Sequence, residues 1–491
     1  MNEKLSDFTR AIHGKKVAVI GIAVSNTPLI EFLSKRGARV TAFDRSDANA
    51  LADRIERLRP CNVEYRLGPD YLSGLTGFDL IFKTPVIRPD IPELNAERAR
   101  GATVTSEMEL FLQLCPATVF GVTGSDGKTT TTTLIYEILK NHGYACHLGG
   151  NIGRPLLPDV ESMSADDMAV VELSSFQLLT MTQSVNVAVV TNLSPNHLDV
   201  HTSYGEYVDA KKNIFAHQSP GDLTVLNYDD DQTRAFGAET TGRLCYFSVT
   251  GGEKITNLFD ASKAIQKPVD FAYINNSEIV YKSYHKRVAG GYAGDVNGAA
   301  RVLRLEDINI PGRHNVENYL AAICAVFDYT NRRDIEKAAG TFTGVEHRIE
   351  FIRKLDGVKY YNDSSASSPS RTIACLKAFN QKVILIAGGK DKDLDFAPLG
   401  QYLADKVKLL ILCGQTSDKI RQSLMDYCVV NEIHCPVKIV DSNSYEDAAN
   451  AARAYASVND VVVLSPAGTS FDRFKNFEER GRAFKNIINK L

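Results

Sequence analysis

Runs of apolar residues alternate with segments of helical periodicity along most of the chain. Short β-rich runs such as 16–21 (KVAVIG) and 118–124 (TVFGVTG) each precede a stretch in which apolar residues recur every three or four positions. This rhythm is typical of mainly parallel sheets, because a helix usually connects two neighbouring parallel strands. The pattern therefore predicts an α/β fold.

The predicted strands fall into three sets. The first set has strands at 16–21, 39–44 and 79–85, with helices at about 26–36 and 48–58. The second has strands at 118–124, 168–175, 187–194 and 224–230, followed by a Gly-rich excursion of short strands in 250–300. The third has strands at 358–363, 382–389, 408–414, 437–442 and 460–468. At roughly 100–200 residues per domain, we expect an N-terminal Rossmann-like domain at 1–106, a central P-loop ATPase-like α/β domain at 107–344 and a C-terminal Rossmann-like domain at 345–491.

Residues 118–134 place a glycine-containing turn between a strand and a helix. Gly124 and Gly127 allow a tight turn whose N–H groups point inward, Lys128 adds a positive charge and Thr129 adds a hydroxyl for Mg²⁺. Val122 stands where a strict phosphate-loop pattern has its first glycine. The segment predicts a variant ATP-binding loop, and a glycine-rich turn of another α/β protein is the alternative.

The first predicted strand ends in a degraded dinucleotide fingerprint, GIAVSN at 21–26. Ala23 and Asn26 replace two of the glycines that let a pyrophosphate approach the backbone. A uridine nucleotide fits this loop better than a redox cofactor, and an ordinary strand–helix turn remains the alternative.

Two further polar residues follow strands of the second set. Glu172 ends a strand, where a nearby Mg²⁺ would offset the cost of burying its carboxylate. His197 directly follows another strand, and we expect it near the phosphates. His197 and His201 are four residues apart, but no third ligand is spaced for zinc.

Composition narrows the classes of partner. The 56 Lys and Arg residues balance 59 Asp and Glu residues, for a net charge of −3, and no basic block indicates nucleic-acid binding. We expect no signal peptide and no membrane insertion, hence a soluble cytoplasmic protein. The nine cysteines form no Cys-x-x-Cys pair, which argues against a disulfide framework or a zinc site.

Several segments together resemble the Mur ligases, the ATP-dependent amide-forming enzymes of peptidoglycan precursor synthesis. They are TGSDGKTT (123–130), GGNIGRPLL (149–157), VELSSFQL (171–178), NLSPNHLDVH (192–201), YVDAKKNIF (207–215), PGRHNVENYLAA (311–322), GVEHRIEF (344–351) and YYNDSSAS (360–367). The closing SPAGTSFDRFKNFEERG (465–481) is most similar to the members that add D-glutamate. The resemblance implies ATP-dependent ligation of D-glutamate to UDP-N-acetylmuramoyl-L-alanine through an acyl phosphate, by a monomer.

The resemblance also implies an ATP and metal site. Its ATP-binding residues are Gly124, Ser125, Asp126, Gly127, Lys128, Thr129, Thr130, Asn318, Arg348 and Asp363. Two Mg²⁺ ions are implied, with Thr129, Glu172, His197 and Lys211 as metal ligands and Lys128, Glu172, His197 and Lys211 as catalytic residues. Lys211 serves in this family after CO₂ carbamylates it, which requires a neutral amine. We expect burial beside another cation, Lys212 or the metal, to lower the pKa of Lys211.

The two substrate sites follow from the same resemblance. The uridine-substrate residues are Val24, Ser25, Asp44, Arg45, Thr84, Asn151, Ser174 and Gln177. The D-glutamate residues are Ser367, Lys392, Ser470 and Phe471. Lys390 is an alternative to Lys392, because the loop GGKDKD has two lysines.

One further departure from the family pattern and two alternative functions remain. Ser365 stands where many relatives have a lysine. A folylpolyglutamate-type ligase would share the phosphate loop and the modified lysine, but it lacks the uridine domain and the closing segment. A nucleotide-binding module without turnover would have lost metal or phosphate residues, and this chain retains them.

Overall fold

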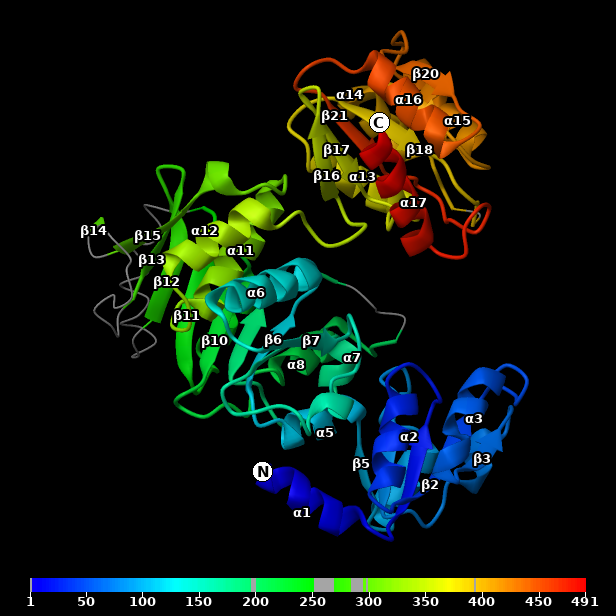
Figure 1. The fold of residues 1–491 in the computed structure, drawn as a ribbon, viewed down its shortest axis with the longest axis vertical. Helices are drawn as coiled ribbons and strands as arrows, with labels where there is room; N and C mark the ends of the chain where they lie inside the picture. Colours follow the sequence, from blue (N-terminus) through cyan, green and yellow to red (C-terminus); the bar gives the residue numbers. More distant parts are fainter. Residues whose placement is uncertain (1, 196–199, 251–268, 284–294, 297–298, 393) are drawn as a thin grey trace. The chain divides into compact units, whose positions relative to one another are not determined.

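The computed structural model describes residues 2–195, 200–250, 269–283, 295–296, 299–392 and 394–491. These residues form three β-sheets with helices packed around them (Figure 1). The chain divides into two compact units, residues 1–305 with 317–338 and residues 306–316 with 339–491. The first unit contains two of the sheets and the second unit contains the third, so the predicted α/β class is confirmed.

The N-terminal sheet has five parallel strands in the order β3-β2-β1-β4-β5. Its strands are β1 (Lys16–Ile20), β2 (Arg39–Asp44), β3 (Glu64–Leu67), β4 (Leu80–Lys83) and β5 (Thr103–Thr105). Its helices are α1 (Glu3–Ile12), α2 (Asn26–Lys35), α3 (Ala52–Leu58) and α4 (Pro92–Ala99), with 3₁₀ turns η1 (Arg59–Cys61) and η2 (Tyr71–Gly74). The strand order reverses between β1 and β4. Such a switch point leaves a crevice at the carboxyl ends of the strands, where ligands bind.

The central sheet has ten strands in the order β14-β15-β13-β12-β11-β10-β9-β6-β8-β7. Its strands are β6 (Thr118–Thr123), β7 (Cys146–Gly150), β8 (Met168–Glu172), β9 (Val187–Val190), β10 (Leu223–Asn227), β11 (Arg243–Ser248), β12 (Val269–Asn275), β13 (Glu278–Lys282), β14 (Asp295–Val296) and β15 (Ala299–Arg304). Its helices are α5 (Glu107–Leu114), α6 (Lys128–His142), α7 (Ser175–Leu178), α8 (Tyr204–Lys212), α9 (Asp231–Phe236), α11 (Arg313–Val326) and α12 (Arg332–Thr341), with η3 (Leu157–Asp159) and η4 (Leu305–Asp307). Strands β6 to β12 pair in parallel, and β13 to β15 add antiparallel pairs at one edge. The predicted excursion of short strands is confirmed for the described part of 250–300.

The C-terminal sheet has six strands in the order β16-β17-β21-β18-β19-β20. Its strands are β16 (Glu350–Leu355), β17 (Val358–Asn362), β18 (Val383–Ala387), β19 (Val407–Leu412), β20 (Lys438–Asp441) and β21 (Val461–Leu464). Its helices are α13 (Pro369–Lys377), α14 (Leu399–Lys406), α15 (Ser417–Val430), α16 (Tyr445–Tyr455) and α17 (Phe477–Lys490). All neighbours pair in parallel except β16 with β17.

Burial explains part of the strand prediction. Strands such as β8, β9 and β18 are buried at every position, and parallel strands covered on both faces read as continuous apolar runs. Strands β3, β5, β7 and β16 were not predicted, because intermediate or exposed positions interrupt their apolar pattern. Strand β11 was also missed although most of it is buried, and β20 was predicted although it is not. The β16–β17 hairpin nevertheless has a local signal, because Asp356 and Gly357 both have positive φ angles of 51° and 81° and Asp-Gly favours such turns.

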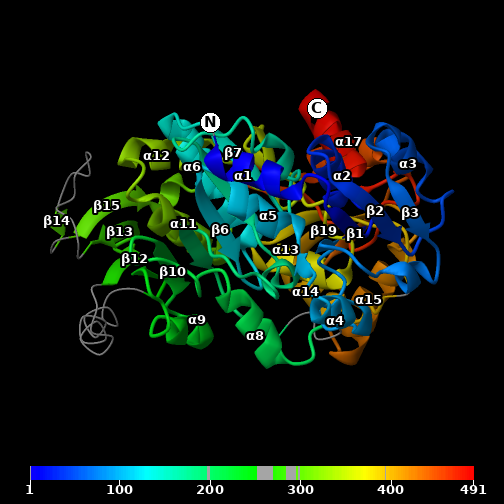
Figure 2. The same ribbon diagram turned by 90° about the horizontal axis from the view of Figure 1, so that it is seen from below.

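The two sheets of the first unit share one continuous hydrophobic cluster. Helix α1 lies beside α5 (Figure 1 and Figure 2), and the Asn2 side-chain amide donates a 2.7 Å hydrogen bond to the Leu114 carbonyl. The cluster runs from Ile12 of α1 and Val17 of β1 to Leu114 of α5 and Val119 of β6. Within the described residues, no helix combines the length and apolarity that crossing a membrane requires.

Gly121, in the middle of β6, leaves no room for a side chain. A Cβ there would lie 2.9 Å from both methyl carbons of Val185. We expect Gly121→Ala to destabilise the first unit by about 1–3 kcal/mol, the usual range for overpacking. Urea unfolding followed by circular dichroism measures the change. The double variant Gly121→Ala/Val185→Ala should be more stable than the sum of the two single effects predicts, and strict additivity would contradict the steric explanation.

Candidate active site

The loop between β6 and α6 has the form of an anion-binding loop. Gly127 precedes α6 with a φ of 80°, and Gly124 has a φ of 147°. A Cβ at Gly124 would lie 1.9 Å from Thr191 Oγ1, and one at Gly127 would lie 2.3 Å from Asn318 Oδ1. Glycine is therefore required at both positions. The first N–H groups of α6 face this loop, where they can bind an anion.

Side chains from other elements hold this loop in place. Ser125 Oγ accepts a 2.8 Å hydrogen bond from the Ser194 N–H and lies 2.8 Å from the Tyr207 hydroxyl. The Asp126 N–H donates to Asn192 Oδ1 at 2.9 Å, and the Asp126 side chain is exposed. Ser125 and Asp126 thus support the loop through polar contacts to the segment after β9.

Asn318, predicted from α11, lies at the same loop. Its Oδ1 accepts a 3.2 Å hydrogen bond from the Thr131 hydroxyl of α6 and would be 2.3 Å from a Cβ on Gly127. Thr130 is buried in the first turn of α6. The structure therefore brings Asn318 to the other predicted ATP residues of the first unit.

Two lysines meet at one carbonyl of the loop. Lys128 Nζ donates to the carbonyl oxygens of Gly124 at 2.9 Å and Ser125 at 2.7 Å. Lys211 Nζ, from α8, donates to the same Gly124 oxygen at 2.9 Å and to Thr123 Oγ1 at 3.2 Å. Both ammonium groups therefore lie beside the carboxyl end of β6.

Lys211 has an unusual environment for a lysine. Its side chain is buried, with 1% of the residue exposed, and Nζ lies 4.7 Å from the centre of the Tyr207 ring. The pKa of Lys211 is lowered to about 7, mainly by burial and also by the Lys128 charge, while Glu172 opposes both effects. The neighbouring cation is thus Lys128. Lys212, which we expected in this role as an alternative to the metal, pairs instead with Glu239 at 2.9 Å, because the next residue on a helix points about 100° away.

Glu172 ends β8 with both carboxylate oxygens occupied. Its Oε2 accepts a 2.7 Å hydrogen bond from the Thr129 hydroxyl, and its Oε1 accepts a 3.0 Å hydrogen bond from the Asn151 amide. Asn151, predicted as a substrate contact, therefore orients this carboxylate. Thr129 and Glu172 thus bring two oxygen atoms together at the end of the phosphate loop, and oxygen is the atom type that Mg²⁺ prefers as a ligand.

The segment after β9 contains two histidines, His197 and His201. His197 lies outside the described residues. His201 Nε2 is 2.9 Å from Ser175 Oγ, and Nδ1 is 3.3 Å from Glu206. Among the described residues, no group of three or more His, Cys, Asp or Glu side chains could hold a metal ion.

The other predicted uridine residues of the central sheet form a helix cap. Ser174 Oγ accepts from the Gln177 N–H at 3.3 Å, and Gln177 Oε1 accepts from the Ser174 N–H at 3.0 Å. This reciprocal pair is a capping box for α7. Both side chains are therefore engaged in fixing the first turn of the helix.

Five predicted uridine residues lie at the carboxyl ends of β1, β2 and β4. Asp44 accepts hydrogen bonds from the N–H groups of Ile22 at 2.7 Å and Ser46 at 2.8 Å, which fixes the turn after β1. Ser25 precedes α2, and Val24 is 70% exposed in the same turn. The remaining two are Arg45, which is exposed, and Thr84, which directly follows β4.

In the second unit, Asp363 follows β17 and is buried. It accepts hydrogen bonds from Ser465 Oγ at 2.8 Å and from the Ile349 N–H at 3.2 Å. Burial raises the pKa of Asp363 to about 6, and the Arg348 charge is among the effects that oppose it. Arg348 is exposed, between His347 and Ile349, whose φ angles are 65° and 45°.

The predicted D-glutamate residues lie on loops after β17, β18 and β21. Ser470 is buried, Phe471 is 57% exposed and Lys392 is exposed. Ser367 N–H donates to the Ser365 carbonyl at 2.9 Å. Lys390 exchanges two backbone hydrogen bonds with Thr469, of 2.8 and 3.0 Å, which joins the second loop to the third.

A buried arginine that sequence reasoning missed connects these loops. Arg480 is fully buried in α17 and donates to the Ser364 hydroxyl at 3.0 Å, the Ser364 carbonyl at 2.8 Å and the Gly468 carbonyl at 3.1 Å. A charged residue on a helix usually indicates a solvated face. No local pattern separates Arg480 from the exposed charges around it.

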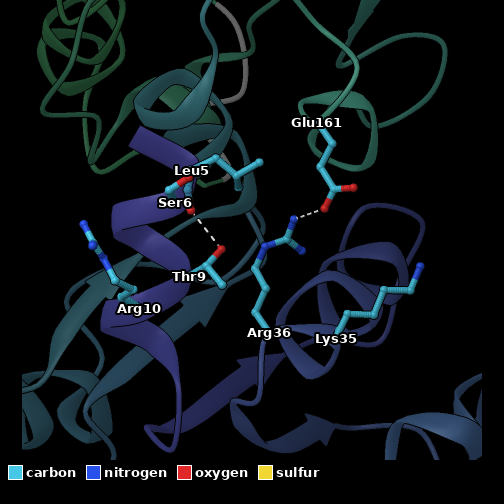
Figure 3. A pocket seen from close by; sticks show the side chains of 7 residues that line it. All are labelled: Leu5, Ser6, Thr9, Arg10, Lys35, Arg36 and Glu161. Carbon is cyan, nitrogen blue, oxygen red and sulfur yellow. Dashed lines mark hydrogen bonds and ion pairs between the residues drawn. The ribbon is translucent and has the colours of Figure 1, made fainter. Parts of the chain in front are cut away.

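A cavity of about 400 Å³ in the first unit lies among none of the predicted residues (Figure 3). Leu5, Ser6, Thr9, Arg10, Lys35, Arg36 and Glu161 line it. In Figure 3 the Arg36 guanidinium extends from the end of α2 to an ion pair with Glu161. This contact ties the small sheet to the central part of the unit.

Family models match both units of the chain. The Mur ligase middle domain matches residues 122–326, and the Mur ligase, glutamate ligase domain matches residues 347–468. This chain belongs to the Mur ligase family.

Relatives of this Mur ligase match it over its whole length. A UDP-N-acetylmuramoylalanine--D-glutamate ligase of Acetivibrio thermocellus is 51% identical over 491 residues, 100% of both chains. One of Ruminiclostridium cellulolyticum is 48% identical over 100% of both chains. The solved UDP-N-acetylmuramate-alanine ligase of Thermotoga maritima has 18% identity and a TM-score of 0.54 over 97% of this chain and 99% of that chain, a likeness of fold.

The low pKa of Lys211 predicts a pH-dependent stability. Between pH 7 and the usual value of 10.5, the unfolded chain holds a proton that folded Lys211 has released, so raising the pH stabilises the folded state. Lys211→Met removes this dependence. We expect the stability advantage of Lys211→Met over the unaltered protein to shrink by about 1 kcal/mol or more between pH 7 and 9. Urea unfolding in CO₂-depleted buffer measures it.

Lys212→Met is the matched control, because Lys212 is the next residue and contacts Glu239 instead of the loop. The difference in unfolding free energy between Lys212→Met and the unaltered protein should not shrink between pH 7 and 9. A Lys211→Met advantage that stays constant from pH 7 to 9 would contradict the shifted pKa.

Proposed function

We propose that the protein ligates D-glutamate to UDP-N-acetylmuramoyl-L-alanine with hydrolysis of ATP to ADP and phosphate, in cytoplasmic peptidoglycan precursor synthesis. The observation that carries this proposal is the identity of about half over the full length with ligases of that name. The phosphate loop, the Thr129–Glu172 pair and the buried Lys211 support the same reaction. The proposed domains are 1–106 for the uridine nucleotide, 107–344 for ATP and 345–491 for the amino acid.

In the proposed reaction, the substrate carboxylate attacks the γ-phosphorus of ATP, and ADP leaves. The amine of D-glutamate then attacks the carbonyl carbon of the acyl phosphate, the amine loses a proton, and phosphate leaves as the amide forms. Phosphoryl transfer of this kind depends mainly on positioning and on neutralising charge. The N–H groups at the start of α6 would hold the phosphates, and Lys128 Nζ would turn from the loop carbonyls to the terminal phosphate.

The donor set fits a magnesium ion. Thr129 Oγ1 and Glu172 Oε2 are adjacent oxygens at 2.7 Å, and Asn151 keeps the carboxylate oriented. Mg²⁺ bound there would neutralise charge on the transferred phosphate. A second ion would use His197 and a carbamate on Lys211. The depressed pKa of Lys211 leaves part of the amine neutral near pH 7, as CO₂ addition requires.

The proposed contacts in the second unit concern the amino acid and the nucleotide. Arg348 and Asp363 would contact ATP, and Ser367, Lys392, Ser470 and Phe471 would bind D-glutamate. Lys392 would provide the charge for a carboxylate of D-glutamate. Lys390 remains the alternative, since its backbone is paired to Thr469 while its side chain is exposed.

Phosphate release tests the proposed reaction. With ATP, Mg²⁺ and UDP-N-acetylmuramoyl-L-alanine, we expect release with D-glutamate and only background release with L-glutamate, L-lysine or meso-diaminopimelate. Release with another of these amino acids would keep the ligase mechanism and change the specificity. No release with any of them would favour a nucleotide-binding module without turnover.

Carbamylation of Lys211 predicts chemical rescue. Lys211→Ala should lose at least about 99% of the activity, on the order of 3 kcal/mol of transition-state stabilisation. Added formate or acetate should restore part of it by replacing the carbamate oxygens. Lys128→Ala is the control, because it removes a cation that a carboxylate cannot replace. Equal response of both variants to the added acids would refute the carbamate.

A further inference from the structure

Lys83 is a buried lysine to which neither the proposed reaction nor the predicted sites assign a role. It is the last residue of β4, and 2% of it is exposed. Among the residues that the structure describes, none forms a hydrogen bond or an ion pair with its ammonium group. Lys211 is equally buried but has two hydrogen-bond acceptors. Lys83 is thus a buried cation without a neutralising contact.

The charges around Lys83 do not compensate for its burial. The pKa of Lys83 is lowered to about 8, mainly by burial and also by the Arg98 charge of α4, while Glu109 of α5 opposes this shift. The Glu109 carboxylate already accepts hydrogen bonds from the Thr105 hydroxyl at 2.9 Å and from the Thr182 N–H and hydroxyl at 3.0 and 2.6 Å. Burying a charge that lacks a partner is costly, so a bound anion would stabilise this site.

Lys83 lies at the point where the strand order of the sheet reverses. In the order β3-β2-β1-β4-β5, the reversal falls between β1 and β4, and Lys83 pairs with Ile20 at the carboxyl ends of these two strands. Gly21 follows β1 with a φ of 89°, and a Cβ there would lie 3.0 Å from Thr84 Cγ2. The two strand ends therefore approach closely at the switch point, the usual position of a nucleotide phosphate in such sheets.

The side chain of Lys83 also continues an apolar face. Successive side chains of a strand alternate between faces, so Lys83 shares the face of Ile81. Ile81 packs with Ile20, Phe43 and Leu94 in the cluster between the sheet and α4. The methylene stem extends this cluster, and its ammonium group comes at the carboxyl edge of the sheet.

We propose that Lys83 binds the diphosphate of the uridine-nucleotide substrate at the crevice between β1 and β4. This inference rests on the proposed function for the identity of the substrate. A lysine ammonium is a compact charge that suits phosphate oxygens. The diphosphate is the part of a uridine nucleotide that carries charge, whereas the uracil and the ribose are neutral. Lys83 therefore contributes to affinity for UDP and not to affinity for uridine.

Calorimetric titration with UDP and with uridine tests this assignment. We expect Lys83→Met to weaken UDP binding tenfold or more, in line with the loss of one charge-assisted hydrogen bond. Lys83→Arg should retain most of the affinity for UDP. Lys83→Met should bind uridine with the same affinity as the unaltered protein. Raising the salt concentration should reduce the UDP affinity of Lys83→Met less than it reduces that of the unaltered protein.

Lys16→Met is the matched control. Lys16 begins β1 at the opposite edge of the same sheet and is exposed, so its loss should leave UDP binding unchanged. Removing an unpartnered buried charge should also leave the unfolding midpoint of ligand-free Lys83→Met equal to or above that of the unaltered protein. A structural role for Lys83 would lower this midpoint.

Four outcomes would overturn the inference. They are equal UDP affinity in Lys83→Met and the unaltered protein, an equal loss for uridine, no UDP binding by the unaltered protein, and failure of both Lys83→Met and Lys83→Gln to fold. UDP binding is measured without turnover. A failed D-glutamate assay would therefore refute the proposed reaction, while the UDP titration would still decide whether Lys83 binds the diphosphate.

Discussion

The carbonyl oxygen of Gly124 accepts hydrogen bonds from two ammonium groups, and the centre of the first unit is arranged around this contact. Lys128 reaches it from α6 and Lys211 from α8, each at 2.9 Å. Gly124 has a φ of 147°, which glycine adopts readily. No other residue fits this position, because Thr191 occupies the space that a Cβ would need. Burial, and after it the neighbouring Lys128 charge, depresses the pKa of Lys211. The backbone conformation at Gly124 thus shapes the phosphate loop and also brings the two lysines together.

The neighbouring strands add the complementary negative charge. Glu172 at the end of β8 is held by Thr129 and Asn151, so its carboxylate is fixed beside the first turn of α6. Parallel strands place their carboxyl ends at one edge, which brings the ends of β6, β8 and β9 to the same side of the sheet. The negative charge of Glu172 therefore partly offsets the two neighbouring positive charges of Lys128 and Lys211, although the three residues come from separate strands and helices.

The second unit reaches a similar arrangement by a different contact. Loops after β17, β18 and β21 meet at one edge of the C-terminal sheet, and the buried Arg480 guanidinium binds the carbonyls of Ser364 and Gly468. A planar guanidinium with five donors can join two backbone segments in a fixed geometry, which a lysine could not do. Arg480 therefore positions the loops that carry Ser367 and Ser470.

The sequence by itself determined the α/β class, the phosphate loop, the family resemblance and many of the strands. These strands are β1, β2 and β4 of the first sheet, β6, β8, β9 and β10 of the second, and β17 to β21 of the third. These features are local, because apolar runs, glycine turns and short motifs are written in consecutive residues. Only the tertiary structure decided that Lys128, and not Lys212, lies beside Lys211, that Asn151 orients Glu172 and that Arg480 is buried. It also decided that the buried Lys83 ammonium has no hydrogen-bond or ion-pair partner among the described residues. Each of these depends on residues brought together from distant segments. Burial and electrostatic interactions act through space, so a sequence pattern cannot distinguish a solvated charge from one enclosed by the fold.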